Sequence, residues 1–384
     1  MTPRERLLTC LAGEMPDCVP VAPDFSNMIP ARRTGKPFWD LYLYNDPPIW
    51  EAYIDCARHF DIDSVMDGYF PFIWPSDPVD ERSWERFIVF RSDERIVVQR
   101  SYAEDGRRVW EDHVTVYYRS DPPTHGVAPT RIGLPAEPEA PEPLEGVRAV
   151  DRGIGGLRRV EELMGDQGLV GVALTSTLVV HGEEDMIRLH ERPEQFEGLI
   201  DQRDREVERR FADLMAMTPE DRPDFLCVGA SGTLVFQSPA TFRHYALPAV
   251  KKAIELATEA GIPTHVHSCG PEKELVRVFA EETSLTVIDP LEIPPMGDCD
   301  LAELKRLYGD KIVLKGNLHT TEVMLRGSVA DVVAASKAAI DAAAAGGRFI
   351  LSTGDQCGRD TPDENLRAMV QIARTYGRYD RAGG

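Results

Sequence analysis

The sequence predicts an α/β fold, a (β/α)8 TIM barrel with an antiparallel β-hairpin insertion, and three observations support this fold class. Eight β-rich segments are each followed by helical sequence, which is the alternation expected of such a barrel. A β-rich stretch at 84–118 and a proline-rich stretch at 121–146 interrupt this alternation. The first strand-to-helix turn lacks Gly-x-Gly-x-x-Gly, which weakens the alternative of a doubly wound open sheet. We therefore expect one domain over residues 1–384, with an insertion at about 84–146.

The chain opens with a helix. Thr2 is a suitable cap, Pro3 suits the first helical position, and the apolar residues at helical spacing end before Gly13. These signals predict a helix over residues 2–12.

The other elements of the barrel follow as alternating strands and helices. Strands are predicted at 17–24, 63–67, 168–174, 224–230, 262–269, 286–291, 311–318 and 348–353. Helices are predicted at 47–59, 182–217, 239–260, 271–283, 300–308, 328–345 and 362–376.

The insertion has its own pattern. Asp105-Gly106 lies between two β-rich runs, which is a hairpin signal, so 84–118 is expected to form antiparallel strands outside the main sheet. Residues 121–146 contain seven prolines and indicate an extended connector.

Residues at the ends of the predicted strands should converge on one mouth, because the carboxyl ends of barrel strands carry ligands and catalysis. This set combines histidine and cysteine with several carboxylates and few positive charges. Its members are Asp24, Asp67, Ser176, Ser231, His267, Cys269, Glu292, Asn317, His319, Asp355 and Cys357.

One strand carries a histidine and cysteine cluster. His265, His267 and Cys269 stand at alternate positions of the strand predicted at 262–269, so their side chains share one face. Zinc suits cysteine sulfur and histidine nitrogen, and a catalytic zinc site usually has three protein ligands and an open position. We expect His267 and Cys269 to bind zinc, with Cys357 as the third ligand.

Other interpretations of these residues stay open. His265 is either a core histidine or a residue that orients His267. Cys299 is a rival third ligand. Glu292 is a fourth ligand, a proton-transfer group or a surface carboxylate, and Asn317 either binds substrate or caps the next helix.

Composition limits the class of partner. The formal net charge of -21 argues against binding to nucleic acid or to an anionic membrane, both of which select basic surfaces. No stretch resembles a secretory signal or a membrane span, so we expect a cytoplasmic protein. The seven cysteines are odd in number and widely spaced, which suits a reducing compartment.

Several motifs, in order along the chain, resemble those of the uroporphyrinogen decarboxylase superfamily. They are residues 2–7 leading to 13–20, Ser238-Pro239 with Leu247-Pro248, His267-Ser268-Cys269-Gly270, Gly316-Asn317-Leu318 and residues 361–366. The resemblance covers nearly the whole chain apart from 84–146, and it implies a (β/α)8 barrel.

The resemblance also favours one branch of that superfamily. The arginine-rich run typical of the decarboxylases is missing from residues 24–35. The cobamide-dependent methyltransferases instead carry a His-x-Cys and a distant cysteine that bind zinc, and His267 and Cys269 match the first of these motifs. Asp355 stands where the distant cysteine is usual, and Cys357 follows two residues later, so either residue could complete the site. We favour Cys357.

This branch implies a zinc-dependent methyltransferase. It would move a methyl group between a small methylated substrate, such as a methoxylated compound, and a corrinoid (cobalamin) carried by a separate protein, with demethylation of the substrate as the favoured direction. The expected catalytic residues are Asp24, Glu292, Asn317 and Asp355. The expected cofactor-binding residues are Ser231, His265 and His319.

Two alternatives stay open. A metal-free uroporphyrinogen-type decarboxylase would use Asp24 or Asp67 to stabilise a protonated pyrrole, with Arg32, Arg33 and Lys36 as the nearby basic residues. A non-catalytic corrinoid- or partner-binding barrel would keep the fold without the chemistry. Assembly into a homodimer is also left open.

Overall fold

The computed structural model describes residues 1–180 and 182–379 and divides the chain into two compact units. The larger unit comprises residues 1–25, 57–76 and 152 onward, and the smaller unit comprises 26–56 and 77–151. The smaller unit therefore takes in residues 26–56 as well as most of the predicted insertion. The single-domain organisation stays a prediction.

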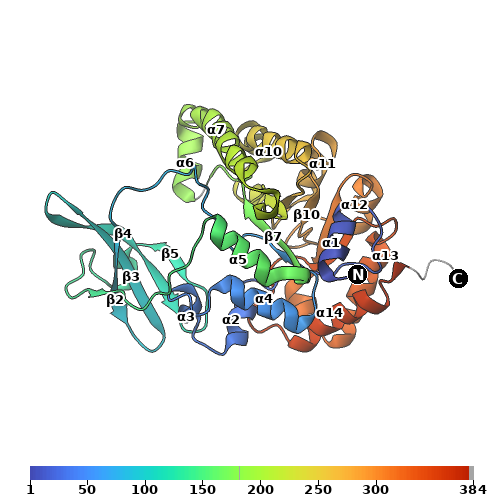
Figure 1. Cartoon of the computed structure of the whole chain (residues 1–384), viewed down its shortest axis with the longest axis horizontal. Coiled ribbons are helices and arrows are strands. Elements are labelled where there is room, and N and C mark those ends of the chain that lie inside the picture. The colour runs from blue at the N-terminus through green and yellow to red at the C-terminus, as the bar shows by residue number, and fades with distance from the viewer. Residues whose placement is uncertain (181, 380–384) are drawn as a thin grey trace. The chain divides into compact units, whose positions relative to one another are not determined.

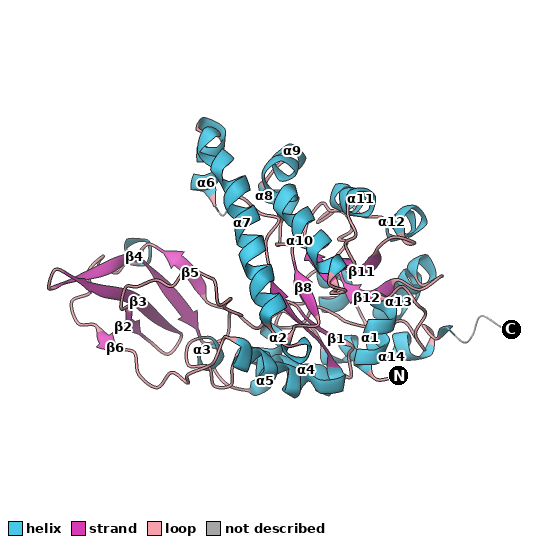
Figure 2. Ribbon diagram, turned by 45° about the horizontal axis from the view of Figure 1, so that its top comes forward, coloured by secondary structure: helices cyan, strands magenta, loops and turns pink. Residues whose placement is uncertain are grey.

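A parallel seven-stranded sheet forms the centre of the larger unit (Figure 2). The strands lie in the order β1-β7-β8-β9-β10-β11-β12, so from β7 onward each strand pairs with the next one in the chain. Parallel neighbours need a crossover connection, which the intervening helices supply. The strands are β1 (Ser64–Met66), β7 (Gly168–Ala173), β8 (Phe225–Cys227), β9 (Thr264–His267), β10 (Val287–Asp289), β11 (Val313–Leu318) and β12 (Phe349–Thr353).

Helices surround this sheet (Figure 1). Among them, α5 packs on β7, α10 on β9, and α13 on β11 and β12. The predicted helices are confirmed, with differences of a few residues at their ends, whereas α5 is not predicted because two glycines in its first turn disfavour a helix. No helix in the described residues is long and apolar enough to cross a membrane. The helices of the larger unit are α1 (Pro3–Leu11), α5 (Ile154–Met164), α6 (Glu183–Glu191), α7 (Glu194–Ala216), α8 (Thr233–Phe236), α9 (Pro239–Thr241), α10 (Leu247–Glu259), α11 (Lys273–Glu282), α12 (Leu301–Tyr308), α13 (Val329–Ala343) and α14 (Asp363–Thr375), and α4 (Ile49–Phe60) begins in the smaller unit and ends in the larger one.

The strand predicted at 17–24 is wrong as a regular strand. Val21 forms an isolated parallel bridge with Leu351 of β12, and on its other side its carbonyl accepts the amide of Asp63 at 2.8 Å. Pro20 and Pro23 lack an amide hydrogen, which limits further pairing. The segment thus bonds to β12 and to the residue before β1, as an eighth barrel strand would. The parallel sheet with its helices fits a barrel-like α/β fold, and complete closure stays a prediction.

The amino-terminal helix α1 packs against the inside of the sheet. Leu7 and Cys10 are fully buried in one apolar cluster with residues of β7, β8, β10, β11 and β12. The predicted cap is present, since the hydroxyl of Thr2 accepts the amide of Glu5 at 3.2 Å and the Glu5 carboxylate accepts the amide of Thr2 at 2.8 Å. This reciprocal pair is a capping box, and it fixes where the helix begins.

A buried ion-pair network ties α1 to the start of β1 and to α14. Nη1 of Arg6 lies 2.5 Å from Oδ1 of Asp63, and Nη1 of Arg374 lies 2.7 Å from Oδ2 of the same carboxylate. Nε of Arg6 also lies 2.7 Å from Oδ1 of Asp17. Because an unpaired buried charge is costly, each member of this network depends on the others.

The smaller unit is built on an antiparallel five-stranded sheet in the order β5-β4-β3-β2-β6 (Figure 2). Asp105 and Gly106 join β3 to β4 with φ values of 49° and 76°, the left-handed conformation that a two-residue hairpin turn needs. The predicted hairpin is confirmed, and the proline-rich connector contributes β5 and β6. The unit also contains α2 (Met28–Thr34) and α3 (Phe38–Tyr42), and its strands are β2 (Glu85–Arg91), β3 (Arg95–Glu104), β4 (Arg107–Tyr118), β5 (Thr124–Val127) and β6 (Glu142–Pro143).

Candidate metal centre

His267 is the last residue of β9, at the carboxyl end of the sheet. Its Nδ1 lies 3.1 Å from Oδ1 of Asp289, the residue that pairs with it across the β9–β10 ladder. Its Nε2 is buried and forms no hydrogen bond with any described residue. The imidazole is therefore held at one nitrogen and lacks a hydrogen-bond partner at the other.

Cys269 and Asp355 lie beside this nitrogen. One donor atom from each of His267, Cys269 and Asp355 lies within 4.8 Å of the other two, and Nε2 of His267 is 3.7 Å from Oδ1 of Asp355. Asp355 follows β12 and has a φ of 102°, a backbone conformation that non-glycine residues rarely adopt. Nitrogen, sulfur and oxygen donors at this spacing suit a borderline-soft cation such as zinc.

Charge around His267 is strongly negative. Burial alone would lower the pKa of His267, but its contact with Cys269 and the nearby carboxylates Asp24, Asp67 and Asp355 raise the pKa to about 9. These carboxylates would favour any cation at this position.

Asp289 supports both histidines of β9. Its Oδ1 lies 3.0 Å from Nε2 of His265 and 3.1 Å from Nδ1 of His267, and its Oδ2 pairs with the ammonium of Lys315. Asp289 and His265 are each 1% exposed. A buried carboxylate behind a histidine fixes the orientation of the ring and raises its basicity as a metal ligand.

Cys357 is not part of the group formed by His267, Cys269 and Asp355. Its amide donates to the carbonyl of Asp24 at 2.9 Å, and its side chain is fully buried. Burial raises the pKa of the Cys357 thiol to about 12, so the thiol is protonated at neutral pH. The structure thus places Asp355 closer to the expected ligand pair, and metal binding by Cys357 stays a prediction.

The other strand-end residues take several positions. The amide of Gly270 donates to Oε2 of Glu292 at 2.5 Å, which ties the loop after β10 to the loop after β9. Nδ2 of Asn317 donates to the carbonyl of Leu291 at 3.1 Å. Nδ1 of His319 accepts the amide of Thr321 at 3.1 Å and so caps the turn at 320–325.

Asp24 and Ser231 lie in loops. The hydroxyl of Tyr69 donates to Oδ1 of Asp24 at 3.1 Å, and the amide of Asp24 donates to the hydroxyl of Thr353 at the end of β12. Asp24 is therefore fixed near the last strand, in agreement with its effect on the pKa of His267. Ser231 is exposed in the turn between β8 and α8.

Asp289 and Lys315 were missed as site residues by sequence reasoning. Both stand inside strands that were predicted correctly, at 286–291 and 311–318. A charged residue in a strand that is buried on both faces needs a partner, so the two charges in neighbouring strands were a usable signal.

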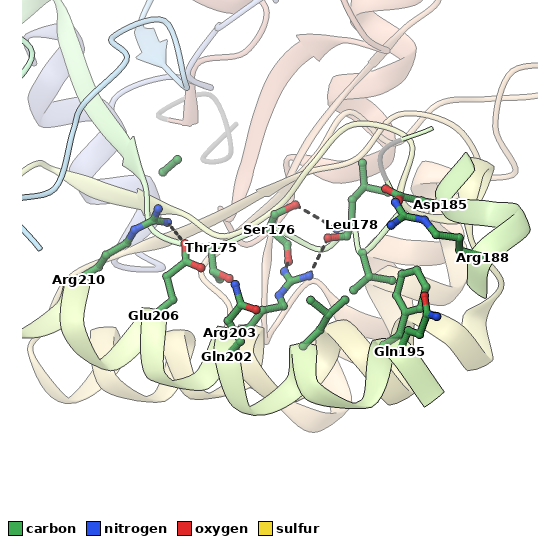
Figure 3. Close-up of a pocket in the computed structure, with 14 residues that line it drawn as sticks. Thr175, Ser176, Leu178, Asp185, Arg188, Gln195, Gln202, Arg203, Glu206 and Arg210 are labelled. Carbon is green, nitrogen blue, oxygen red and sulfur yellow. Dashed lines mark hydrogen bonds and ion pairs between the residues drawn. The ribbon is translucent and has the colours of Figure 1, made fainter. Parts of the chain in front are cut away.

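A separate cavity of about 600 Å³ lies beyond the carboxyl end of β7, between the following loop and α7 (Figure 3). Nη1 of Arg203 donates to the carbonyl of Leu178 at 2.7 Å, and Nη2 donates to the carbonyl of Ser176. Nη1 of Arg210 donates to the carbonyl of Leu174 at 3.0 Å. Two arginines of α7 thus hold the loop that lines the cavity. Its volume is in the range of small-molecule sites.

The carboxyl-terminal part of the chain matches a known family. Residues 220–376 match the model of the uroporphyrinogen decarboxylase (URO-D) family. This segment runs from before β8 to the end of α14 and includes His267, Cys269 and Asp355.

Two curated relatives match a shorter stretch. The chain is 29% identical over 137 residues to methylcobamide:CoM methyltransferase MtbA of Methanosarcina mazei, and 26% identical over 137 residues to the protein of the same name of Methanosarcina acetivorans. Each match covers 35% of this chain and 37% of the relative, so the chain matches little more than a third of the length of these relatives.

One solved structure covers nearly the whole chain. It is a methyltransferase from Methanosarcina mazei with a TM-score of 0.59 and 16% sequence identity, and the match covers 98% of this chain and 99% of that one. At this identity the likeness concerns the fold alone.

Proposed function

Because this chain belongs to the uroporphyrinogen decarboxylase superfamily, on the branch of the cobamide-dependent methyltransferases, we propose that it is a zinc-dependent methyltransferase. It would move a methyl group between a small methylated substrate and a corrinoid carried by a separate protein. The sequence likeness to two methylcobamide:CoM methyltransferases supports this class of reaction.

The observation that carries the proposal is the environment of His267. Nδ1 is held by Asp289, while Nε2 is buried beside a thiol and a carboxylate without a hydrogen bond to any described residue. Buried polar atoms normally have a partner, so such a nitrogen suits a metal-binding atom. A carboxylate on the opposite nitrogen is the usual support of a metal-bound histidine.

The residues that would hold zinc are His267, Cys269 and Asp355. Cys357 is the competing third ligand, but its thiol would have to leave its contacts with Thr353 and Thr361 to reach the site. Three protein ligands leave one position open for a substrate atom.

When bound, zinc would act as a Lewis acid on the substrate atom that carries the methyl group or on an accepting thiol. Glu292 would hold and transfer a proton, because burial raises the pKa of its carboxyl group. Asp24, fixed by Tyr69, and Asn317, fixed through its Nδ2, would orient the substrate beside His267. Asp355 would serve as ligand and carry no separate acid or base role.

The corrinoid would meet the partly or fully exposed residues of the mouth. Ser231 is exposed and His319 is intermediate in exposure, so we assign both to this contact. His265 is 1% exposed, and we assign it an indirect role through Asp289.

We favour demethylation of a methoxylated or similar donor as the direction of transfer. The cavity beyond β7 offers about 600 Å³ for the part of such a donor that does not react. Its lining combines apolar side chains, such as Phe196 and Leu199, with polar ones, such as Gln195 and Gln202, which suits a small organic molecule.

The test combines metal analysis with activity. The parent protein and the Cys269→Ala, Asp355→Ala and Cys357→Ala variants would be purified without added metal and analysed for zinc. Methyl transfer from methoxylated donors to cob(I)alamin would be followed by absorbance. Cys269→Ala and Asp355→Ala should each lose about one equivalent of zinc and the activity, because each removes one of three ligands.

Cys10→Ala is the matched control, since Cys10 is a fully buried cysteine outside the group. Zinc loss in Cys357→Ala with retention in Asp355→Ala would reassign the third ligand. Full zinc content in a folded Cys269→Ala protein would refute the site. Zinc without methyl transfer would favour a binding protein.

A further inference from the structure

A second group of three potential ligands comes from the residue after β1, from the end of β8 and from within β9. It consists of Asp67, Cys227 and His265, whose donor atoms all lie within 4.8 Å of one another. Asp67 follows β1, Cys227 ends β8 and His265 lies in β9. Two neighbouring strands, β8 and β9, and the residue after β1, which lies beyond β7 in the sheet, therefore bring their donors to one point.

His265 repeats the arrangement of His267. Its Nε2 lies 3.0 Å from Oδ1 of Asp289, the same oxygen that holds His267. Its Nδ1 lies 2.9 Å from Oδ2 of Asp67 but is misaligned, and it forms no hydrogen bond with any described residue. The side chain is 1% exposed, so water from the surface does not satisfy this nitrogen. Each histidine thus presents one nitrogen to a cysteine and an aspartate.

The charge balance also suits a cation. Donor atoms of Cys227 and Asp67 lie within 4.8 Å of each other, and Cys227 is 6% exposed. Among the described residues, Lys315 has its ammonium group nearby, but this group is already paired with Asp289. A partly buried carboxylate beside a buried thiolate would need a compensating positive charge.

We propose that Asp67, Cys227 and His265 form a second zinc site, separate from the one at His267. Nitrogen, sulfur and oxygen donors are the set that zinc accepts, and zinc binding would release the thiol proton of Cys227 to solvent. The side chain of Asp67 is 26% exposed and gives the ion a route of entry. The ion would join the ends of β1 and β8 to β9, so it would stabilise the sheet whether or not the protein transfers methyl groups.

The site is tested by zinc stoichiometry. Metal-free parent protein and the Cys227→Ala, Cys269→Ala and double variants would be titrated with zinc sulfate by calorimetry, with a chromophoric chelator as a second readout. We expect about two equivalents in the parent, about one in each single variant and none in the double variant. Cys10→Ala, another fully buried cysteine, should bind as the parent does.

Cobalt(II) gives an independent readout, because a thiolate ligand produces an intense charge-transfer band. The band should persist in Cys269→Ala and vanish in the double variant. If Cys227→Ala does not fold, Asp67→Asn, at a partly exposed position, replaces it and should also lose one equivalent.

A Cys227→Ala or Asp67→Asn protein with the zinc content of the parent would overturn the second site. This outcome differs from failure of the proposed function. If the His267 site were wrong, Cys269→Ala would bind as much zinc as the parent, and the loss would appear only in Cys227→Ala.

Discussion

Replacing Asp289 with asparagine should weaken zinc binding at His267 by about 10–100-fold. Oδ1 of Asp289 accepts from His265 at 3.0 Å and from His267 at 3.1 Å, and Oδ2 pairs with Lys315. An asparagine offers one oxygen and one NH2 group to these three donors. Whichever way the amide turns, a donor faces another donor.

The expected loss of zinc affinity follows from that mismatch. Leaving a buried polar group without its partner costs about 1–3 kcal/mol. Each 1.4 kcal/mol corresponds to about a tenfold change in affinity, so the cost agrees with the range known for supporting carboxylates. The substitution weakens zinc binding because His267 is no longer held with Nε2 toward Cys269 and Asp355.

Competition with a chromophoric chelator would measure the affinity, in a Cys227→Ala background so that one site is read. Asp224→Asn is the matched control, because Asp224 is a carboxylate only 10% exposed and paired with Arg4 just before β8, at the opposite end of the strands. Circular dichroism would confirm that both variants fold. An Asp289→Asn protein that folds and binds zinc as tightly as its background would refute this role for Asp289.

Three further predictions concern the fold. Arg6→Met should lower the free energy of unfolding by about 1–3 kcal/mol in urea titrations, because Asp63 loses one of its two arginine partners and keeps Arg374; an unchanged midpoint would contradict this. Burial alone would raise the pKa of Asp17, but Arg6 holds it below its usual range. The stabilising contribution of Asp17 is therefore complete above the unfolded-state pKa of about 3.9 and is lost as the pH falls through the lower folded-state pKa. The difference in free energy of unfolding between parent and Asp17→Asn should shrink only in acid. A pH-independent difference would argue against this contribution of Asp17. Gly229→Ala should lower the free energy of unfolding by about 1–3 kcal/mol and weaken zinc binding, because the added Cβ would lie 2.8 Å from the backbone nitrogen of His267. Zinc affinity equal to that of the parent would show that the backbone there does not need to move.

Local patterns predicted the order of the elements. Helix caps such as Thr2, turn residues such as Asp105-Gly106 and the alternation of apolar runs are properties of neighbouring residues, so they can be recognised without the rest of the chain. The segment around Val21 was harder to predict. Its two prolines limit regular strand pairing, and its bonds to Leu351 and Asp63 join it to residues that are distant in sequence.

The same distinction applies to the site. The sequence by itself determined that His265, His267 and Cys269 share one face, since alternation along a strand is local. The tertiary structure decided that Asp289 stands opposite His267, that Lys315 pairs with Asp289, and that Asp355 joins the group instead of Cys357. These contacts depend on the register between parallel strands and on the path of the loop after β12. Both are set by packing across the whole sheet, which no single stretch of sequence specifies.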